Sequence, residues 1–525
     1  MKFKITLKQL LLILITVISL IPFCLSLVNS LTEAQVQTNL QLSQTNLMLE
    51  ATTLQSEGNS NQASLALLLL GKDPYQVATD QYQEAISKID KNQQKIQASL
   101  SALQEVNGTK ASQDIVSIVE PNPAQVKILQ SSLQTVTLNR QKAVLNLGLL
   151  AKQQDKDSLA RQQWQDIIAL EVTNSQQLLP IQKTAEILFQ LWEQSPQISP
   201  DAQAILEKNL SGWFRDRALT QFYQVRQERS QLQQLQQEEQ ERAKQAFLKL
   251  ILLSVLPVLG GSLGIGLLLV LLLQWFLKKD EAILALNTLT VWQTPWDWEM
   301  IWQVLGIGFF FLGQIGLPLI LSLIHLDASS LSLRGKAVYV LCSYLAMTLG
   351  GLSVLYFSLK PFFPLTADWF SFRWQSRWWL WGLGGYLVAL PLVVLVSLIN
   401  QQFWQGQGGS NPLLFLALEA QDKVVLIIFF FTASIAAPFF EEIIFRGFLL
   451  PSLTRYLPVS GAIILSSFVF AIAHLNLSEV LPLAILGMVL GTVYARSRNL
   501  LASMLLHSLW NSGTLISLFI LGSAG

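Results

Sequence analysis

The sequence has little cysteine and little charge, and each scarcity excludes a class of protein. Only two of its 525 residues are cysteine, Cys24 and Cys342, and both lie in apolar runs, so neither a disulfide framework nor a cysteine-based zinc site can form. Charged residues make up 13% of the chain, whereas soluble domains contain about 25%. A net charge of +1 without a basic stripe excludes a nucleic-acid binder.

The chain is instead rich in apolar residues, which make up 51% of it and give a mean hydropathy of +0.41. A helix needs about 20 apolar residues to cross about 30 Å of hydrocarbon. The sequence therefore predicts an all-α, polytopic transmembrane helical bundle, with an N-terminal anchor span and a core of about eight spans. The apolar runs, of which the seventh and eighth are short, lie near residues 10–28, 250–277, 301–324, 337–358, 378–399, 424–450, 461–476, 480–495 and 500–521.

Residues 1–29 form either a retained signal anchor or a cleaved signal peptide. Three lysines precede an apolar run of 19 residues from Leu10 to Val28, and no small-x-small exit follows it. Cleaved signals have apolar regions of about 7–15 residues. The length of the apolar run favours a retained anchor, and cleavage of residues 1–29 stays open as the alternative.

Residues 30–246 differ in character from the rest of the chain. They are rich in glutamine, and their apolar residues recur three and four apart, which predicts a soluble helical domain inserted after the first span. The stretch 219–235 predicts one long amphipathic helix that continues into the next span. This domain binds an unknown protein partner or acts as a spacer, and residues 247–525 form the membrane-embedded core.

Loop charge predicts the orientation. With the N-terminus in the cytoplasm, eleven Lys and Arg residues fall in inner loops and three, Arg334, Lys336 and Lys423, fall in short outer loops. Positive charge favours the cytoplasmic side. We therefore expect a multi-pass protein of a bacterial plasma (inner) membrane, or an equivalent internal membrane, with residues 30–246 extracytoplasmic.

Three charged residues interrupt the span near 424–450: Glu441, Glu442 and Arg446. Insertion scales put the cost of each at roughly 2.5–3.5 kcal/mol at the bilayer centre, so their presence demands a reason. Glu442 and Arg446 are four residues apart and can pair on one face, which favours a structural role in support of the site. Glu441 points about 100° away and has no such neighbour in its helix.

Two further spans each carry a histidine, His474 and His507, and Asn511 lies on the same helical face as His507. Measured from the predicted cytoplasmic helix ends, Glu441, His474 and His507 lie roughly 15, 20 and 12 Å deep. The third histidine, His325, lies at a predicted outer boundary and is set aside as a hydrogen-bonding residue. The shared depth on three helices predicts one polar site.

The pattern Glu-Glu-x-x-x-Arg, then Phe-x-x-x-His, then His-x-x-x-Asn on successive membrane helices resembles the signature of the CPBP family of intramembrane proteases. That family includes Rce1-like CAAX prenyl endopeptidases and bacteriocin-immunity (Abi) proteins. The resemblance covers residues 420–515, and the eight spans from 250 onward fit the family's membrane core. Residues 30–246 are not part of the common pattern.

The resemblance implies roles for the site residues. Glu441 would be the general base that activates a water, and His474 would hold or polarise that water. His507 and Asn511 would stabilise the oxyanion. Glu441, His474 and His507 would be the ligands if Zn²⁺ is bound, and a metal-free glutamate mechanism is equally open.

The implied substrate is a membrane protein or a lipidated peptide in the bilayer, hydrolysed near its C-terminus. Two other classes stay open. One is a catalytically silent scaffold or immunity-type protein that acts through the helical domain. The other is a transporter, since buried Glu, Arg and His also form proton relays, although no internal repeat supports it.

Overall fold

The computed structural model describes residues 6–522 apart from 32, 34, 57–68, 109–122, 171–177, 194–195, 197, 286–290, 324–330 and 420–421. In these residues the secondary structure is helical and no β-strand forms. The all-α class predicted from the sequence is therefore confirmed. His325, and residues 420–421 of the motif-bearing segment, lie outside the described part.

The chain divides into two compact units. Unit 1 comprises residues 1–36 and 255–522, and unit 2 comprises residues 37–254 together with 523–525. The first limit of unit 2 falls seven residues after the predicted start of the soluble domain, and its second limit falls eight residues after the predicted end. That second limit lies inside one continuous helix, α10 (Arg229–Lys278).

Unit 2 is built from amphipathic helices around one apolar core. Trp164, Leu188 and Phe222 are fully or almost fully buried in this core. Gly148 permits the approach of Trp164, because a Cβ atom there would lie 2.3 Å from the indole nitrogen. Its helices are α2 (Gln37–Ala51), α4 (Pro74–Gly108), α5 (Pro123–Gln153), α6 (Asp157–Ile168), α7 (Leu179–Leu191), α8 (Ala202–Asn209), α9 (Gly212–Val225) and the first part of α10.

The prediction of a single long helix over 219–235 is wrong in one respect. Helix α9 ends at Val225 and α10 begins at Arg229, because Gln227 adopts a left-handed conformation with φ of 57°. A left-handed residue cannot continue a right-handed helix. From Arg229 onward α10 does run without a break into apolar sequence, as predicted.

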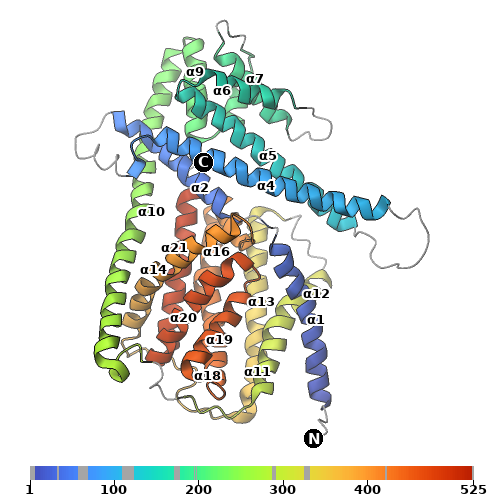
Figure 1. The fold of residues 1–525 in the computed structure, drawn as a ribbon, viewed down its shortest axis with the longest axis vertical. Coiled ribbons are helices and arrows are strands. Elements are labelled where there is room, and N and C mark those ends of the chain that lie inside the picture. Colours follow the sequence, from blue (N-terminus) through green and yellow to red (C-terminus); the bar gives the residue numbers. More distant parts are fainter. Residues whose placement is uncertain are drawn as a thin grey trace. The chain divides into compact units, whose positions relative to one another are not determined.

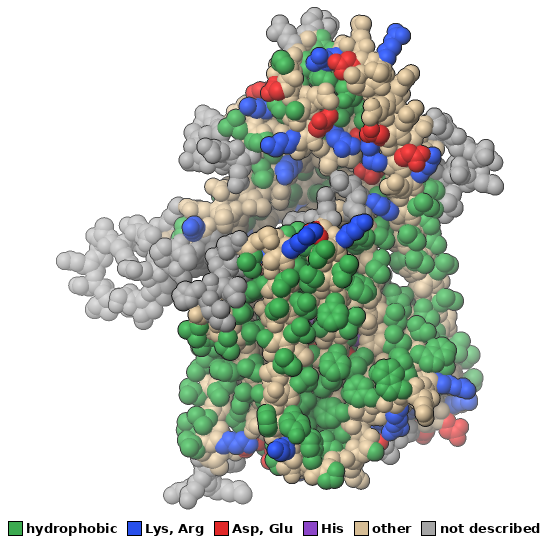
Figure 2. Space-filling model, turned by 180° about the vertical axis from the view of Figure 1, so that it is seen from behind, with side chains coloured by type: hydrophobic (Ala, Val, Ile, Leu, Met, Phe, Trp, Pro, Cys, Tyr) green, Lys and Arg blue, Asp and Glu red, His purple; other side chains and the backbone are tan. Residues whose placement is uncertain are grey.

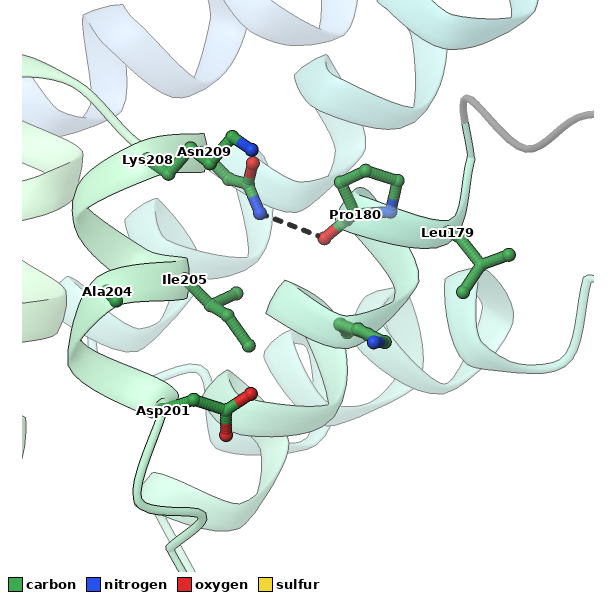
Figure 3. Close-up of a pocket in the computed structure, with 8 residues that line it drawn as sticks. Leu179, Pro180, Asp201, Ala204, Ile205, Lys208 and Asn209 are labelled. Carbon is green, nitrogen blue, oxygen red and sulfur yellow. Dashed lines mark hydrogen bonds between the residues drawn. The ribbon is translucent and has the colours of Figure 1, made fainter.

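A shallow pocket lies between α7 and α8 of unit 2 (Figure 3). The Asn209 side-chain amide donates to the Pro180 carbonyl at 3.1 Å beside it. The lining includes one carboxylate, Asp201, and two lysines, but no histidine. This pocket therefore lacks the combination of glutamate and histidine that is present in unit 1.

Among the described residues, eight helices are long and apolar enough to cross a membrane, and Figure 1 shows how the helices are arranged. The sixth of them is built from the consecutive segments α16 (Lys423–Phe431), η8 (Thr432–Ala436), α17 (Ala437–Glu441), η9 (Glu442–Leu449) and α18 (Leu450–Leu453). The eight helices span Leu7–Ser30 (α1), Arg229–Glu281 (α10 and η3), Trp298–Leu323 (α11, η5 and α12), Leu333–Phe362 (α13 and η7), Trp378–Trp404 (α14), Lys423–Leu453, Leu477–Ser497 (η10 and α20, Val480–Ser497) and Leu500–Gly522 (α21).

The seventh predicted span, near 461–476, forms a shorter helix, α19 (Val459–Ile472). Its 14 residues rise about 21 Å, which is less than the hydrocarbon thickness. The described residues therefore contain eight long apolar helices and this ninth, shorter one, which packs against α20.

Large apolar side chains cover the outer face of unit 1 that Figure 2 displays. Examples along the spans are Leu273, Phe276 and Leu395, which are 60%, 69% and 58% exposed. A soluble domain does not leave so much contiguous apolar surface in water, whereas lipid solvates it. Unit 1 therefore makes the chain an integral, multi-pass membrane protein.

Small residues bring the helices of unit 1 close together, as is common where membrane helices pack. A Cβ atom at Gly264 of α10 would lie 1.9 Å from the Leu387 carbonyl oxygen of α14. A Cβ atom at Gly487 of α20 would lie 2.8 Å from Ser467 of α19. Helices α19, α20 and α21 also pack against the helix that carries the two glutamates.

Candidate active site

The two glutamates lie on a helix with two π-helical segments. The first, η8, spans Thr432–Ala436, and the second, η9, spans Glu442–Leu449, so α17 with Glu441 at its end lies between them. Such segments insert an extra residue into a helical turn and occur frequently at functional sites. Here they change the direction in which the side chains around Glu441 and Glu442 point.

Pro438 and the first π segment leave backbone carbonyls without their helical partners. The Ala437 N–H donates to Thr432 five residues back, and Pro438 has no N–H to donate to Ala433 or Ser434. Two side chains of α21 supply these hydrogen bonds. Asn511 Nδ2 donates to the Ala433 carbonyl at 2.7 Å, and Ser508 Oγ donates to the Ser434 carbonyl at 2.5 Å.

A buried triad joins the same two helices. Arg446 Nη1 donates to Glu442 Oε1 at 2.8 Å, and His507 Nδ1 lies 2.8 Å from the same oxygen. The three residues are 1%, 0% and 2% exposed. The pairing of Glu442 with Arg446 occurs as their spacing predicts. The contact between Glu442 and His507 was not predicted, and this contact fixes the orientation of the imidazole.

Phe470 packs against three of the site residues. The Arg446 guanidinium lies over its ring, 4.3 Å from the centroid. The rings of His474 and His507 meet it edge-on, with centroid distances of 4.8 and 5.7 Å. One aromatic ring from α19 therefore brings the two histidines to the same region.

Glu441 has a different environment from Glu442. The Tyr344 hydroxyl of α13 (Leu333–Leu359) donates to Glu441 Oε1 at 3.2 Å. The other oxygen, Oε2, is buried, makes no hydrogen bond to any described residue, and lies 3.8 Å from His507 Nε2. Glu441 therefore presents one carboxylate oxygen without a protein partner toward an imidazole nitrogen.

His474 is held by the end of its own helix and the loop that follows. Its Nδ1 lies 2.9 Å from the Phe470 carbonyl, the bond expected of an Nδ1–H tautomer, which leaves Nε2 as an acceptor. Asn476 Nδ2 donates to the His474 carbonyl at 3.1 Å and to Glu479 at 3.4 Å. Leu475 between them takes a left-handed conformation with φ of 65°, so these contacts hold a strained backbone.

The structure thus brings Glu441, Glu442, Arg446 and His507 into direct contact or near contact, and connects His474 to them through Phe470. Asn511 lies one turn from His507 on α21, as predicted, but its amide is bonded to the Ala433 carbonyl. Its proposed role toward an oxyanion stays a prediction. Tyr344 was missed, because a tyrosine in an apolar run carries no signal that distinguishes it from a packing residue.

The site contains few residues that could bind a metal ion together. In the described part of the chain no group of three His, Cys, Asp or Glu side chains lies close enough together to hold an ion. Glu441 and His507 face each other, yet His474 does not complete a ligand set with them. Zinc binding by Glu441, His474 and His507 therefore stays a prediction.

Fold and site together define a multi-pass helical membrane protein with a buried glutamate–histidine centre. Residues 423–513 match the family model described as type II CAAX prenyl endopeptidase Rce1-like. This segment, which contains the three motifs, is therefore similar to the Rce1-like family. Tyr344 lies outside the matched segment.

A curated relative points to the same class. The chain is 26% identical over 138 residues to the protein of Bacillus subtilis (strain 168) named "Putative membrane peptidase YdiL". The alignment covers 26% of this chain and 55% of that protein, so it spans about half of the relative's length. No solved structure matches the chain.

Proposed function

We propose that this protein is an intramembrane endopeptidase, and that it hydrolyses a peptide bond of a membrane-associated substrate with a water activated by Glu441. The observation that carries the proposal is the geometry of Glu441. Its Oε2 is buried without a hydrogen-bond partner among the described residues and lies 3.8 Å from His507 Nε2. The Rce1-like match over 423–513 supports the reaction class.

The separation of these two atoms suits a shared water. A distance of 3.8 Å is too long for a direct hydrogen bond, but one water can bond to both atoms. The water would give a proton to Glu441 Oε2 while its oxygen attacks the peptide carbonyl carbon. The tetrahedral intermediate then breaks its C–N bond, and the proton passes from Glu441 to the leaving nitrogen, which yields an acid and an amine.

His507 would stabilise the oxyanion that forms in this step. With its Nδ1–H on Glu442, a protonated His507 would direct its Nε2–H toward the reacting oxygen. The charges of Glu441, Glu442, Arg446 and His507 would then sum to zero, which lowers the cost of burying them. We assign Glu442 and Arg446 to holding the imidazole, His474 to the water or the substrate, and Asn511 to the oxyanion.

The proposed substrate is a membrane protein or a lipid-modified C-terminal peptide that reaches the site within the bilayer. The description of the matched family names a CAAX prenyl endopeptidase, so a prenylated C-terminal peptide is the first substrate to test beside its unmodified form. We propose that the helical domain of residues 30–246 binds a protein partner or spaces one from the membrane.

Substrate trapping tests the proposed function. Full-length wild type and Glu441→Gln are purified from membranes, and the bound peptides and metal content of the same samples are compared. Glu299→Gln is the matched control, because Glu299 pairs with Lys8 and has no contact with the site. We expect membrane peptides to accumulate on Glu441→Gln alone.

Cleavage in lipid vesicles tests the same proposal directly. Glu441→Ala and His474→Ala should each abolish cleavage of the trapped substrate while both variants stay folded and inserted. Full cleavage by either variant would refute the assignment. An absence of trapped peptide on Glu441→Gln would favour the scaffold alternative.

A further inference from the structure

Glu441 receives a hydrogen bond from a helix outside the segment that carries the family motifs. The Tyr344 hydroxyl of α13 donates to Glu441 Oε1 at 3.2 Å, and residues 423–513 do not include this helix. The second oxygen, Oε2, is the atom that faces His507 at 3.8 Å. One oxygen of the Glu441 carboxylate therefore accepts a hydrogen bond from α13, and the other faces His507 on α21.

The close approach of α13 to Glu441 depends on a glycine two turns further along the helix. Tyr344 and Gly351 are seven residues apart and share one face of α13. A Cβ atom at Gly351 would lie 2.9 Å from the ring of Phe440, the neighbour of Glu441, and 2.8 Å from the Gly308 carbonyl. Only a residue without a side chain fits between these groups, so α13 packs directly on the helix at Phe440.

The ring of Phe440 also contacts Tyr344, and this contact limits where the phenol can point. The two rings meet edge-on at 86°, with centroids 6.3 Å apart. Phe440 is fully buried, so it cannot move away to release the tyrosine. The hydroxyl is therefore held on the Glu441 side of α13.

We propose that Tyr344 is a positioning residue for Glu441, an inference that rests on the proposed function. By holding Oε1, the hydroxyl fixes the carboxylate rotamer so that Oε2 faces His507 and the shared water. A carboxylate without this donor could rotate about its side-chain bonds and lose the alignment that efficient attack requires. Glu442 needs no such donor, because Arg446 and His507 already hold it.

The variant Tyr344→Phe tests the proposal, because it removes the hydroxyl and keeps the ring that packs on Phe440. Tyr494→Phe is the matched control. Tyr494 is fully buried, and its hydroxyl has no hydrogen-bond partner in the described structure. Cleavage of the trapped substrate is followed in vesicles with wild type, both tyrosine variants and Glu441→Gln.

We expect Tyr344→Phe to lower kcat about ten- to a hundredfold, because this factor corresponds to the free energy of one hydrogen bond to a charged group. The KM of the variant should stay within about twofold of the wild-type value. Tyr494→Phe should match wild type in both constants. A tyrosine that only packs the helix would leave kcat unchanged in the phenylalanine variant. Wild-type kcat in Tyr344→Phe, or an equal loss in Tyr494→Phe, would overturn the proposal.

A second measurement asks whether Tyr344 acts through Glu441. In Glu441→Asp the carboxylate is one methylene shorter, so the hydroxyl no longer reaches it. Adding Tyr344→Phe to this variant should then cost less than about twofold, whereas independent effects would multiply. If wild type itself lacks Glu441-dependent cleavage, the proposed function fails. If wild type cleaves and Tyr344→Phe cleaves equally well, only the inference about Tyr344 fails.

Discussion

The buried triad makes a quantitative prediction about what Arg446 contributes. Arg446→Leu would leave the Glu442 carboxylate, which is 0% exposed, without the guanidinium that lies 2.8 Å away. Removing one member of a buried ion pair costs about 3–5 kcal/mol. Loss of the guanidinium from the Phe470 ring, at 4.3 Å, adds up to about 2 kcal/mol. These losses approach the whole stability of an ordinary domain.

The double variant Glu442→Gln, Arg446→Leu should separate stability from activity. With both charges removed, no uncompensated ion stays buried, so we expect most of the lost stability to return. Cleavage should stay lost, because His507 Nδ1 no longer has the carboxylate at 2.8 Å that orients it. A triad that served only as structural support would recover cleavage together with stability.

The assay follows thermal unfolding and cleavage of the full-length protein in the same lipid or detergent preparation. Arg334→Leu is the control, because Arg334 forms an exposed pair with Asp422 and exposed pairs contribute little. The reasoning is refuted if Arg446→Leu unfolds at the temperature of Arg334→Leu. It is equally refuted if the double variant is no more stable than Arg446→Leu alone.

Three further predictions concern the docking of α21, the helical domain and the topology. Asn511→Ala removes the bond to the Ala433 carbonyl and should cost about 0.6–1.7 kcal/mol of stability, measured as a lower unfolding temperature. An unchanged unfolding temperature with lost cleavage would instead assign Asn511 to the oxyanion alone. Burial raises the pKa of Glu50 to about 7, against the opposing attraction of Lys249. Its folded pKa exceeds the unfolded value of 4.5, so its stabilisation is present below pH 4.5 and is lost as the pH rises through 7. The unfolding temperature of Glu50→Gln should therefore fall less than that of wild type between pH 5 and 8, and parallel curves would contradict the assignment. A reporter that is active only outside the cytoplasm should be active when fused near residue 150 and silent near residue 285, and the reverse pattern would overturn the predicted topology.

The sequence predicted helices well wherever one physical requirement dominated. Long apolar runs must form helices, because lipid offers no hydrogen bonds to the backbone. Eight of the nine predicted spans accordingly appear as long helices. The run near 461–476, which is short in the sequence as well, forms a 14-residue helix. The break at Gln227 was missed because a left-handed glutamine has no sequence signature.

The site was predictable in its residue types but not in its pairing. The spacing of Glu442 and Arg446 correctly predicted their contact, because residues four apart on a helix are neighbours. The partner of His507 could not be deduced, because it depends on the rotation of α21 against the helix with two π segments. That rotation is fixed by Asn511 and Ser508 on carbonyls that Pro438 and the first π segment leave free.

By itself the sequence determined the class of the protein, its apolar spans and the small set of polar residues that lipid would otherwise exclude. It did so because the energetic cost of a polar group in hydrocarbon is local and can be assigned to single residues. Only the tertiary structure decided that Glu442 holds Nδ1 of His507 and that Glu441 faces its Nε2. The approach of α13 at Gly351, which delivers the Tyr344 hydroxyl to Glu441, arises from packing between helices about a hundred residues apart and has no local signal in the chain.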